Sequence, residues 1–313
     1  MEIKPKSIWN FIKDVFDKFI DDKAPKLGAA LSFYTIFSLA PLLIISISVA
    51  GSIFGRRAAR GEIVGQIKSF IGEDGAMLIQ TTLRNVHHHT HESGIALIVS
   101  VITLIIGSTI VFVDLQESLD MVWKVKPKPE RGMIKGLLKD RIRSFSVVVG
   151  TGFLLLVSLI VSAVISSLNN YISEQFFELP VFFLQLSNML VSLFIIFLLF
   201  MMIFKFLPDV KIEWRHVWVG ALVTAVLFVL GKYLIGLYLG TSSLSSTYGA
   251  AGSLVILLLW VYYSSQILFL GAEFTQVYVE KYGEGIKPNG KFMKYHDEKA
   301  ALEPVDKVEK VNR

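Results

Sequence analysis

The sequence has no cysteine, and only 18% of its 313 residues carry a charged side chain. The missing cysteines exclude disulfides, thiolate metal sites and a cysteine nucleophile. Charge is also absent from several long stretches, while hydrophobic residues account for 53% of the chain, unlike the usual mix of a soluble domain. No polar region is large enough for a separate soluble enzyme domain. The composition therefore predicts an integral membrane protein that is not an enzyme.

Six apolar runs are each long enough to cross a hydrocarbon core roughly 30 Å thick as a helix of about 20 residues. Backbone groups in lipid need hydrogen-bond partners within their own segment, so each run is expected to be helical. Only the fifth run contains a charged residue, Lys232. We predict an all-α, polytopic membrane protein whose spans lie at about residues 31–54, 94–113, 145–168, 181–204, 217–239 and 252–272.

The regions outside the spans have distinct characters. Residues 1–26 form a cytoplasmic arm whose apolar residues recur at helical spacing, which predicts an amphipathic helix lying at the membrane interface or packed on the protein's own cytoplasmic surface. Residues 55–93 are predicted to be an extracytoplasmic helical insert. The six-helix transmembrane domain covers 27–280, and the charged tail at 281–313 is expected to be largely disordered.

The distribution of lysine and arginine predicts the orientation, because short cytoplasmic segments carry an excess of both. The N-terminal arm has six, the segment after the second span eight, the fourth connection three and the tail eight, whereas the connections 169–180 and 240–251 have none. The first connection, with five, is the exception. Both termini are therefore predicted to be cytoplasmic. We interpret the net charge of +5 as contact with membrane lipids rather than with nucleic acid.

Ionisable residues at membrane depth are functional candidates, because burying a charge in lipid is costly. Lys232 lies fifteen residues beyond Val217, roughly 22 Å along a helix, in the outer part of the bilayer. Its ammonium group would contact a substrate or proton, extend to the outer surface, or form a structural ion pair.

A second group of polar residues is predicted at the cytoplasmic ends of the spans. It would serve as a transport site or as a charge network that fixes helix ends. The candidates are Asp114, Gln116, Glu117, Lys205, Asp209 and, at the end of the sixth span, Glu273.

Three residues are candidates for hinges or special backbone. Pro41 should kink the first span unless neighbouring groups compensate, since it lacks a backbone donor. Gly249 and Gly252 belong to an uncharged stretch rich in glycine and hydroxyl groups, Gly240 to Ser253, which is a surface loop or a segment that dips into the membrane. Gly236 and Gly240 have the spacing of closely packed helices.

The histidine run at 87–91 is the most metal-like feature of the sequence. His87 and His91 would share one face of a helix, but spacing defines no third ligand. We therefore predict no metal site and no cofactor.

Four long stretches combine apolar residues with polar ones at fixed positions: LGAALSFYTIFSLAPLLI (27–44), FVDLQESLDMVWKV (112–125), FLPDVKIEWRHVWVGAL (206–222) and STYGAAGSLVILLLWVYYSSQILFLGAEFTQVY (246–278). In these stretches the chain resembles the YihY/BrkB family of bacterial inner-membrane proteins, formerly labelled ribonuclease BN. The resemblance covers about residues 27–280 and implies a six-helix protein of the bacterial plasma membrane.

The resemblance supplies no catalytic motif, so the function is argued from the residues. The histidine cluster is predicted outside the cell, and Asp114, Glu117 and Asp120 lie on one helix end without an RNA-binding fold, which argues against a ribonuclease. The leading hypothesis is a transporter, exporter or lipid translocator for an unknown small molecule, ion or lipid. The alternative is a membrane scaffold that transports nothing. The sequence leaves the oligomeric state open, and a homo-oligomer is compatible with it.

Overall fold

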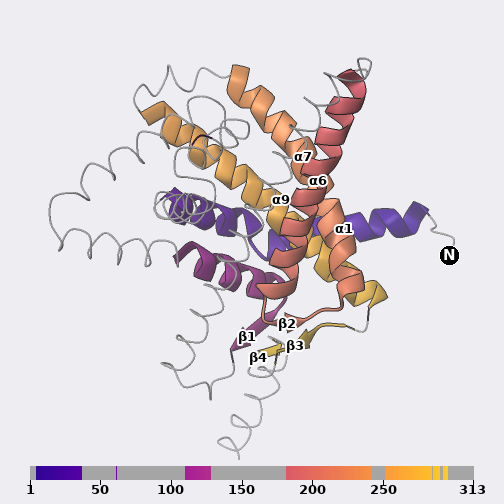
Figure 1. Ribbon diagram of the computed structural model, residues 1–313. Helices are drawn as coiled ribbons and strands as arrows, with labels where there is room; N and C mark the ends of the chain where they lie inside the picture. The colour runs from indigo at the N-terminus through magenta and orange to yellow at the C-terminus, as the bar shows by residue number, and fades with distance from the viewer. Residues whose placement is uncertain are drawn as a thin grey trace, which may run out of the picture.

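The computed structural model describes residues 5–36, 61, 110–127, 181–241, 251–283, 285–289 and 292–294. Over these ranges the chain is 85% helical, in six helices (Figure 1). Two of the helices occupy residues 24–36 and 110–122. The others are α1 (Pro5–Asp21), α6 (Val181–Phe206), α7 (Trp214–Thr241) and α9 (Gly252–Tyr282). The predicted all-α fold class is confirmed.

Two of these helices, Trp214–Tyr238 and Gly252–Tyr282, are long and apolar enough to cross a membrane, and Ser192–Phe206 within α6 is a shorter apolar stretch. Helices α6 and α9 begin at the residues where the fourth and sixth spans were predicted to begin. The helix at 24–36 begins before the predicted first span and includes part of the arm. The third predicted span, and the insert 55–93 apart from Gly61, lie outside the described residues.

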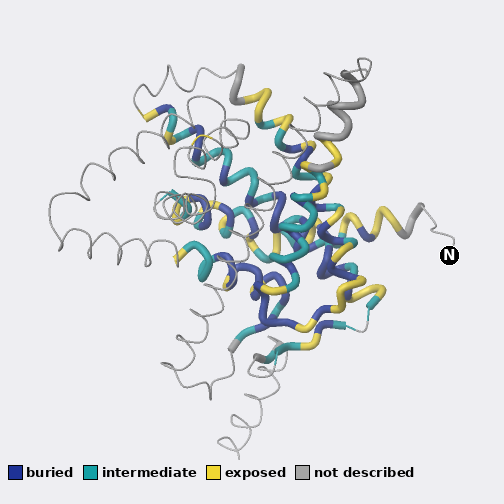
Figure 2. The backbone as a smooth tube through the Cα atoms, viewed as in Figure 1, coloured by how far each residue is buried: buried dark blue, intermediate teal, exposed yellow. Residues whose placement is uncertain are grey.

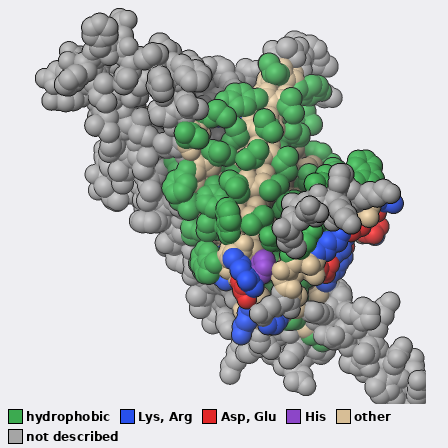
Figure 3. All heavy atoms as spheres, turned by 90° about the vertical axis from the view of Figure 1, so that its right-hand side faces the viewer, with side chains coloured by type: hydrophobic (Ala, Val, Ile, Leu, Met, Phe, Trp, Pro, Cys, Tyr) green, Lys and Arg blue, Asp and Glu red, His purple; other side chains and the backbone are tan. Residues whose placement is uncertain are grey.

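Helix α7 carries an exposed apolar stripe along its length. Its members recur about every four residues, so they share one face of the helix: Trp218, Leu222, Val226, Leu230 and Leu234. Hydrophobic side chains cover most of the described surface in Figure 3, whereas charged side chains gather at its lower end. An apolar surface of this extent is suited to lipid rather than to water.

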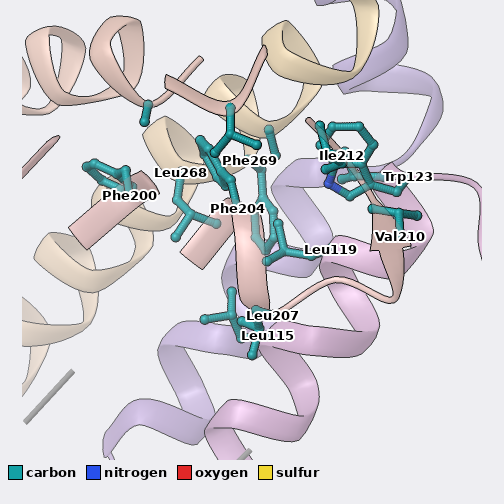
Figure 4. Packing of buried hydrophobic residues seen from close by; sticks show 14 of the residues in the cluster. Leu115, Leu119, Trp123, Phe200, Phe204, Leu207, Val210, Ile212, Leu268 and Phe269 are labelled. Atoms are coloured by element: carbon teal, nitrogen blue, oxygen red, sulfur yellow. The ribbon is translucent and has the colours of Figure 1, made fainter. Parts of the chain in front are cut away.

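The hydrophobic core lies where α6, α7, α9 and the helix at 110–122 meet (Figure 2). Phe204 of α6, Leu119 of the helix at 110–122 and Phe269 of α9 are each fully buried. Figure 4 shows these side chains together, with Trp123 and Ile212 packed beside them. Dense packing in this region fixes the position of α9, which carries the polar residues considered below.

Helices α7 and α9 approach most closely through two reciprocal glycine–threonine contacts. A Cβ atom on Gly220 would lie 1.8 Å from Oγ1 of Thr275, and one on Gly271 would lie 2.0 Å from Oγ1 of Thr224. Each threonine hydroxyl donates to the carbonyl oxygen of the glycine four residues earlier in its own helix, at 2.7 Å for Thr224 and 2.6 Å for Thr275. The two helices are therefore in close contact, and both threonine hydroxyls at the contact have a hydrogen-bond acceptor within their own helix.

Of the two glycines whose spacing suggested close packing, the structure describes the surroundings of Gly236 alone. No described atom lies within 4 Å of a Cβ placed on Gly236. Small residues permit a close approach only on the face that meets a neighbouring helix, so close packing through Gly236 and Gly240 stays a prediction. Gly252 is buried as the first residue of α9.

Two short antiparallel strand pairs lie below the helices in Figure 1. Strand β1 (Val125–Pro127) pairs with β4 (Phe292–Lys294), and β2 (Val210–Lys211) pairs with β3 (Lys287–Pro288). The expectation of a largely disordered tail was thus wrong for residues 285–289 and 292–294. Their backbone groups pair with two connections between helices, and Ile286 is buried in the core, which composition alone does not indicate.

Helix α1 has two apolar sides. On one, Phe11 and Val15 are buried against the C-terminal half of α9, and the rings of Phe11 and Phe274 lie 5.1 Å apart. The other side is exposed and includes Ile8, Trp9, Ile12, Phe16 and Ile20. Packing on the protein's own surface therefore accounts for only part of the amphipathic pattern.

Replacing Gly271 by valine should lower thermal stability, because the branched side chain would overlap Thr224 of α7. Overpacking of this kind typically costs about 1–3 kcal/mol. Thermal unfolding of the purified protein in detergent measures the effect. Gly236→Val is the matched control, because its side chain would enter space without described neighbours. An equal loss of stability in both variants would contradict the importance of the close contact.

Candidate functional site

Glu273 is the most unusual polar residue of the described structure. In the sequence it lies on α9 between Gly271 and Thr275, but it is on the side of the helix away from their contact with α7, and its exposed fraction is 0%. Neither of its carboxylate oxygens has a hydrogen-bond partner among the described residues. A buried carboxyl group without donors is costly, so it points to a function or to a bound cation.

Asp22 and Lys124 lie beside Glu273. The carboxyl group of Asp22 faces that of Glu273. Lys124 donates from its Nζ atom to Oδ1 of Asp22, while Oδ2 of Asp22 is buried without a described hydrogen-bond partner. Two carboxyl groups thus share one neighbouring lysine.

The backbone holds this site in an uncommon conformation. Lys23 and Lys124 have φ angles of 57° and 55°, and they are the non-glycine residues with positive φ in the described ranges. Each follows the last turn of a helix, where glycine usually adopts this left-handed conformation. A residue with a Cβ atom costs about 1–2 kcal/mol more there. Both strained residues border the Asp22 contact, as is common at functional sites.

A polar cluster separates Glu273 from the end of α9. Lys18 of α1 donates to Oε1 of Gln276 at 2.7 Å and to Oε2 of Glu280 at 2.5 Å, and Gln276 donates to Oε1 of Glu280 at 2.8 Å. Gln276 is buried, whereas the Glu280 side chain is 44% exposed. These groups connect the surface with the interior near Glu273.

A second contact between α1 and α9 lies at the surface. Lys281 donates to Oδ2 of Asp14 at 2.5 Å, and this hydrogen bond holds the pKa of Asp14 below its usual range. Both side chains are more than one third exposed, so the pair contributes little to stability.

Gln266 continues the polar face of α9 in the other direction. It lies seven residues before Glu273, which places both on the same side of the helix, about 10 Å apart along its axis. A Cβ atom on Gly28 would lie only 2.0 Å from Nε2 of Gln266. The missing side chain at Gly28 therefore leaves room for this amide, whose two polar atoms are buried without described hydrogen-bond partners.

Gln116, Asp120 and Asp209 form a separate buried cluster. Gln116 donates to Oδ2 of Asp209 at 3.0 Å, and the backbone N–H of Asp209 donates to Oδ1 of Asp120 at 2.7 Å. The carbonyl oxygen of Asp209 accepts from the backbone N–H of Asn289 at 2.9 Å. These bonds join the helix at 110–122, the end of α6 and the tail, so the geometry favours the interpretation that these residues fix helix ends.

Lys205, Asp114 and Glu117, which were also predicted at the cytoplasmic ends of the spans, have described neighbours other than Glu273. Lys205 donates to the carbonyl oxygen of Ile212 at 2.5 Å, and its Nζ atom lies 5.1 Å from the ring centroid of Trp214. Asp114 is half-buried, and its Oδ2 atom has no described hydrogen-bond partner, while Glu117, three residues later, is exposed.

Lys232 lies at a different position from Glu273 along the axis of α9. Its neighbour Gly231 packs against Tyr263 and Ile267, which precede Glu273 by ten and six residues, roughly 9–15 Å along α9. Of the hinge and histidine candidates, Pro41, Gly249, His87 and His91 lie outside the described residues. Among the residues that are described, no three acidic or histidine side chains converge on a point that suits a metal ion.

Asp22 and Lys124 were missed as site residues because they lie in turns and look like ordinary interfacial charges in the sequence. Glu273 was identified by its position at the end of a span. The available signal for Lys124 was its place in the quoted stretch FVDLQESLDMVWKV, which contains charged residues beside a buried tryptophan.

A family described as "Virulence factor BrkB" matches residues 15–296. The UPF0761 membrane proteins of Azotobacter vinelandii and Pseudomonas paraeruginosa are each 27% identical to this chain over 84% of its length, and cover 62% and 61% of the relatives' own length. A third, from Psychrobacter sp., is 22% identical over 85% of this chain and 47% of its own. The chain spans about half to three fifths of the length of these curated relatives. No solved structure matches it.

The matched region contains α6, α7 and α9, together with Glu273 and its neighbours Asp22 and Lys124. Relatives across it are named membrane proteins, in agreement with the two membrane-length helices. The chain therefore belongs to the BrkB family, also called YihY/BrkB, and is a membrane protein.

Proposed function

We propose that this protein is a transporter, exporter or lipid translocator of the bacterial inner membrane, whose substrate passes between its helices. The observation that carries the proposal is Glu273: a fully buried carboxyl group, without a described hydrogen-bond partner, on a membrane-length helix. Ionisable groups in such positions commonly belong to substrate, ion or proton pathways.

Energetics favour a working site over a purely structural one. A buried ion pair that loses one partner costs about 3–5 kcal/mol, so a stranded carboxylate is a large burden for a fold. The neighbouring lysine Lys124 donates to Asp22, not to Glu273, in the described structure. A group left in this state gains stability when a cation or a substrate group binds to it.

The alternative is a non-transporting membrane scaffold. The bonds around Asp209, and the exposed apolar side of α1, would serve that role by holding helix ends and binding lipid. They do not account for Glu273. A ribonuclease is the least favoured reading, and we propose no catalytic centre, cofactor or nucleic-acid partner. Membrane lipids are the expected surroundings, and the proposal leaves room for a homo-oligomer.

The proposed orientation places both termini, the strand pairs and the Glu273 site at the cytoplasmic side. Cysteines introduced at Lys211, before α7, and at Ser243, after it, test this in a chain that has no cysteine of its own. An impermeant thiol reagent added to intact spheroplasts should label position 243 and not 211. Labelling of both positions after lysis is the control. The reverse pattern would invert the orientation.

Glu273→Gln should abolish transport, because glutamine keeps the size of the side chain and removes its ability to ionise. The substrate is first sought by mass spectrometry of solutes and lipids in cells with wild-type or variant protein, and its flux is then measured in proteoliposomes. Glu213→Gln, at an exposed glutamate that pairs with Arg215, is the matched control and should transport normally. Normal flux through folded Glu273→Gln protein would refute the proposed site.

Lys232→Met tests the candidate in α7, because methionine keeps the side chain's length and removes its charge. A transport role predicts unchanged thermal stability with lost or pH-shifted flux. Lower stability would instead indicate a structural ion pair, and a variant normal in both respects would mean that the lysine only extends to the surface. If Asp114 and Glu117 also serve transport, Asp114→Asn combined with Glu117→Gln should likewise keep its thermal stability and show lost or pH-shifted flux.

A further inference from the structure

We propose that Asp22 and Glu273 together bind one exchangeable proton, taken up from the cytoplasm, and that this proton is the coupling ion. The proposal rests on the transport function above. It adds the chemical identity of the ion, its binding residues and its route.

The charges around the pair require one more positive charge. Two carboxyl groups face each other, and one lysine, Lys124, donates to Asp22. Lys18 also lies nearby on α1, but its ammonium group is held by Gln276 and Glu280. The described surroundings therefore leave one negative charge uncompensated in a site where Glu273 is fully buried and the Asp22 side chain is 10% exposed. Two adjacent carboxylates in such a site are most stable when they share a single proton.

A proton suits this site better than a metal ion. A metal cation of the size of Na⁺ or Ca²⁺ requires several oxygen ligands arranged around it. The described residues bring only two carboxyl groups together, and Lys124 would repel a metal ion held between them. A proton needs one oxygen to bond to and a second oxygen to accept its hydrogen bond, which is what the pair supplies.

The route to the cytoplasm follows one face of α9. Glu273 and Glu280 are seven residues apart, so they lie on the same side of the helix about 10 Å apart along its axis. Gln276 lies between them and is bonded to Glu280, while Lys18 closes the outer end of this group. Movement of Lys18 away from Glu280 would open the route, because that lysine joins α1 to both polar residues.

Gln266 lies the same distance beyond Glu273, toward the membrane interior. Its amide is buried, without described hydrogen-bond partners, in the space left by Gly28. An amide can donate to one group and accept from another, so Gln266 can bind a substrate or a water molecule when the proton is bound at the pair. The row Glu280, Gln276, Glu273 and Gln266 is thus a polar path along one face of α9.

The binding step involves one O–H bond. A proton leaves hydronium in cytoplasmic water and bonds to a carboxylate oxygen of the pair, with the other carboxylate accepting its hydrogen bond. Release breaks the same O–H bond and returns the proton to water. No oxidant, reductant or further reactant takes part.

Infrared spectroscopy of the purified full-length protein tests the proposal, because a protonated carboxyl group has a C=O band distinct from that of a carboxylate. We expect wild-type protein near neutral pH to show a protonated carboxyl band that shifts in D₂O and disappears as the pH is raised. Glu273→Gln should lack this band, and Glu213→Gln should retain it. Asp22→Asn should also lack it, since Lys124 is then free to pair with Glu273.

Three results would overturn the proposal. The first is a wild-type spectrum without a titrating protonated carboxyl band, which requires no variant to fold. The second is loss of that band on adding Na⁺ at constant pH, which would identify a metal cation as the ligand. The third is a marked fall in the thermal stability of Glu273→Gln, because replacing a protonated carboxyl group by an amide of the same shape should preserve stability, whereas replacing a charged partner should not.

The infrared band and the flux test the proton site and the transport function separately. A Glu273-dependent band together with normal Glu273→Gln flux would retain the proton site and reject its role in transport. Absence of the band together with lost flux would retain transport and reject this proton.

Discussion

The close contact between α7 and α9 is the constraint on which the site depends. Gly220 and Gly271 allow the two helices to approach until each meets a threonine of the other. Both threonine hydroxyls donate to carbonyl oxygens of their own helices, so neither needs a hydrogen-bond acceptor from another element. This contact fixes the part of α9 that carries Glu273, which lies two residues beyond Gly271 on the opposite side of the helix and is fully buried.

The surroundings of Glu273 are built from turns, while Glu273 itself is on a helix. Asp22 follows α1, and Lys124 follows the helix at 110–122. Each turn contains a lysine in a left-handed conformation that glycine would adopt at lower cost. A fold selected for stability alone has no need of this strain. The combination of a rigid helix carrying the buried acid and two strained turns facing it is typical of a site that must change its charge or its contacts.

The sequence was sufficient for the fold class and for the helices with long apolar runs, because the bilayer imposes a strong requirement on length and composition. It also marked Glu273 by its place at the end of a span. It could not find the partnership with Asp22 and Lys124, because these residues are separated from Glu273 by more than a hundred positions along the chain and meet only through tertiary packing. The tail strands were missed for the same reason, since short strands far apart in sequence are specified by their partners.

The tail strands and α1 both restrain the C-terminal end of α9. Strand β3 follows α9 directly, and its pairing with β2 holds the end of α9 against the connection between α6 and α7. Helix α1 binds the same part of α9 through Phe11 and Lys18, yet it keeps an exposed apolar side. Because Lys18 bonds to Gln276 and Glu280, a shift of α1 along the membrane surface would change the cover of Glu273 while the strands hold α9 in place. Under the proposed proton route, α1 is therefore the element that would uncover Gln276 and Glu280, while the pairing of β2 with β3 holds the end of α9.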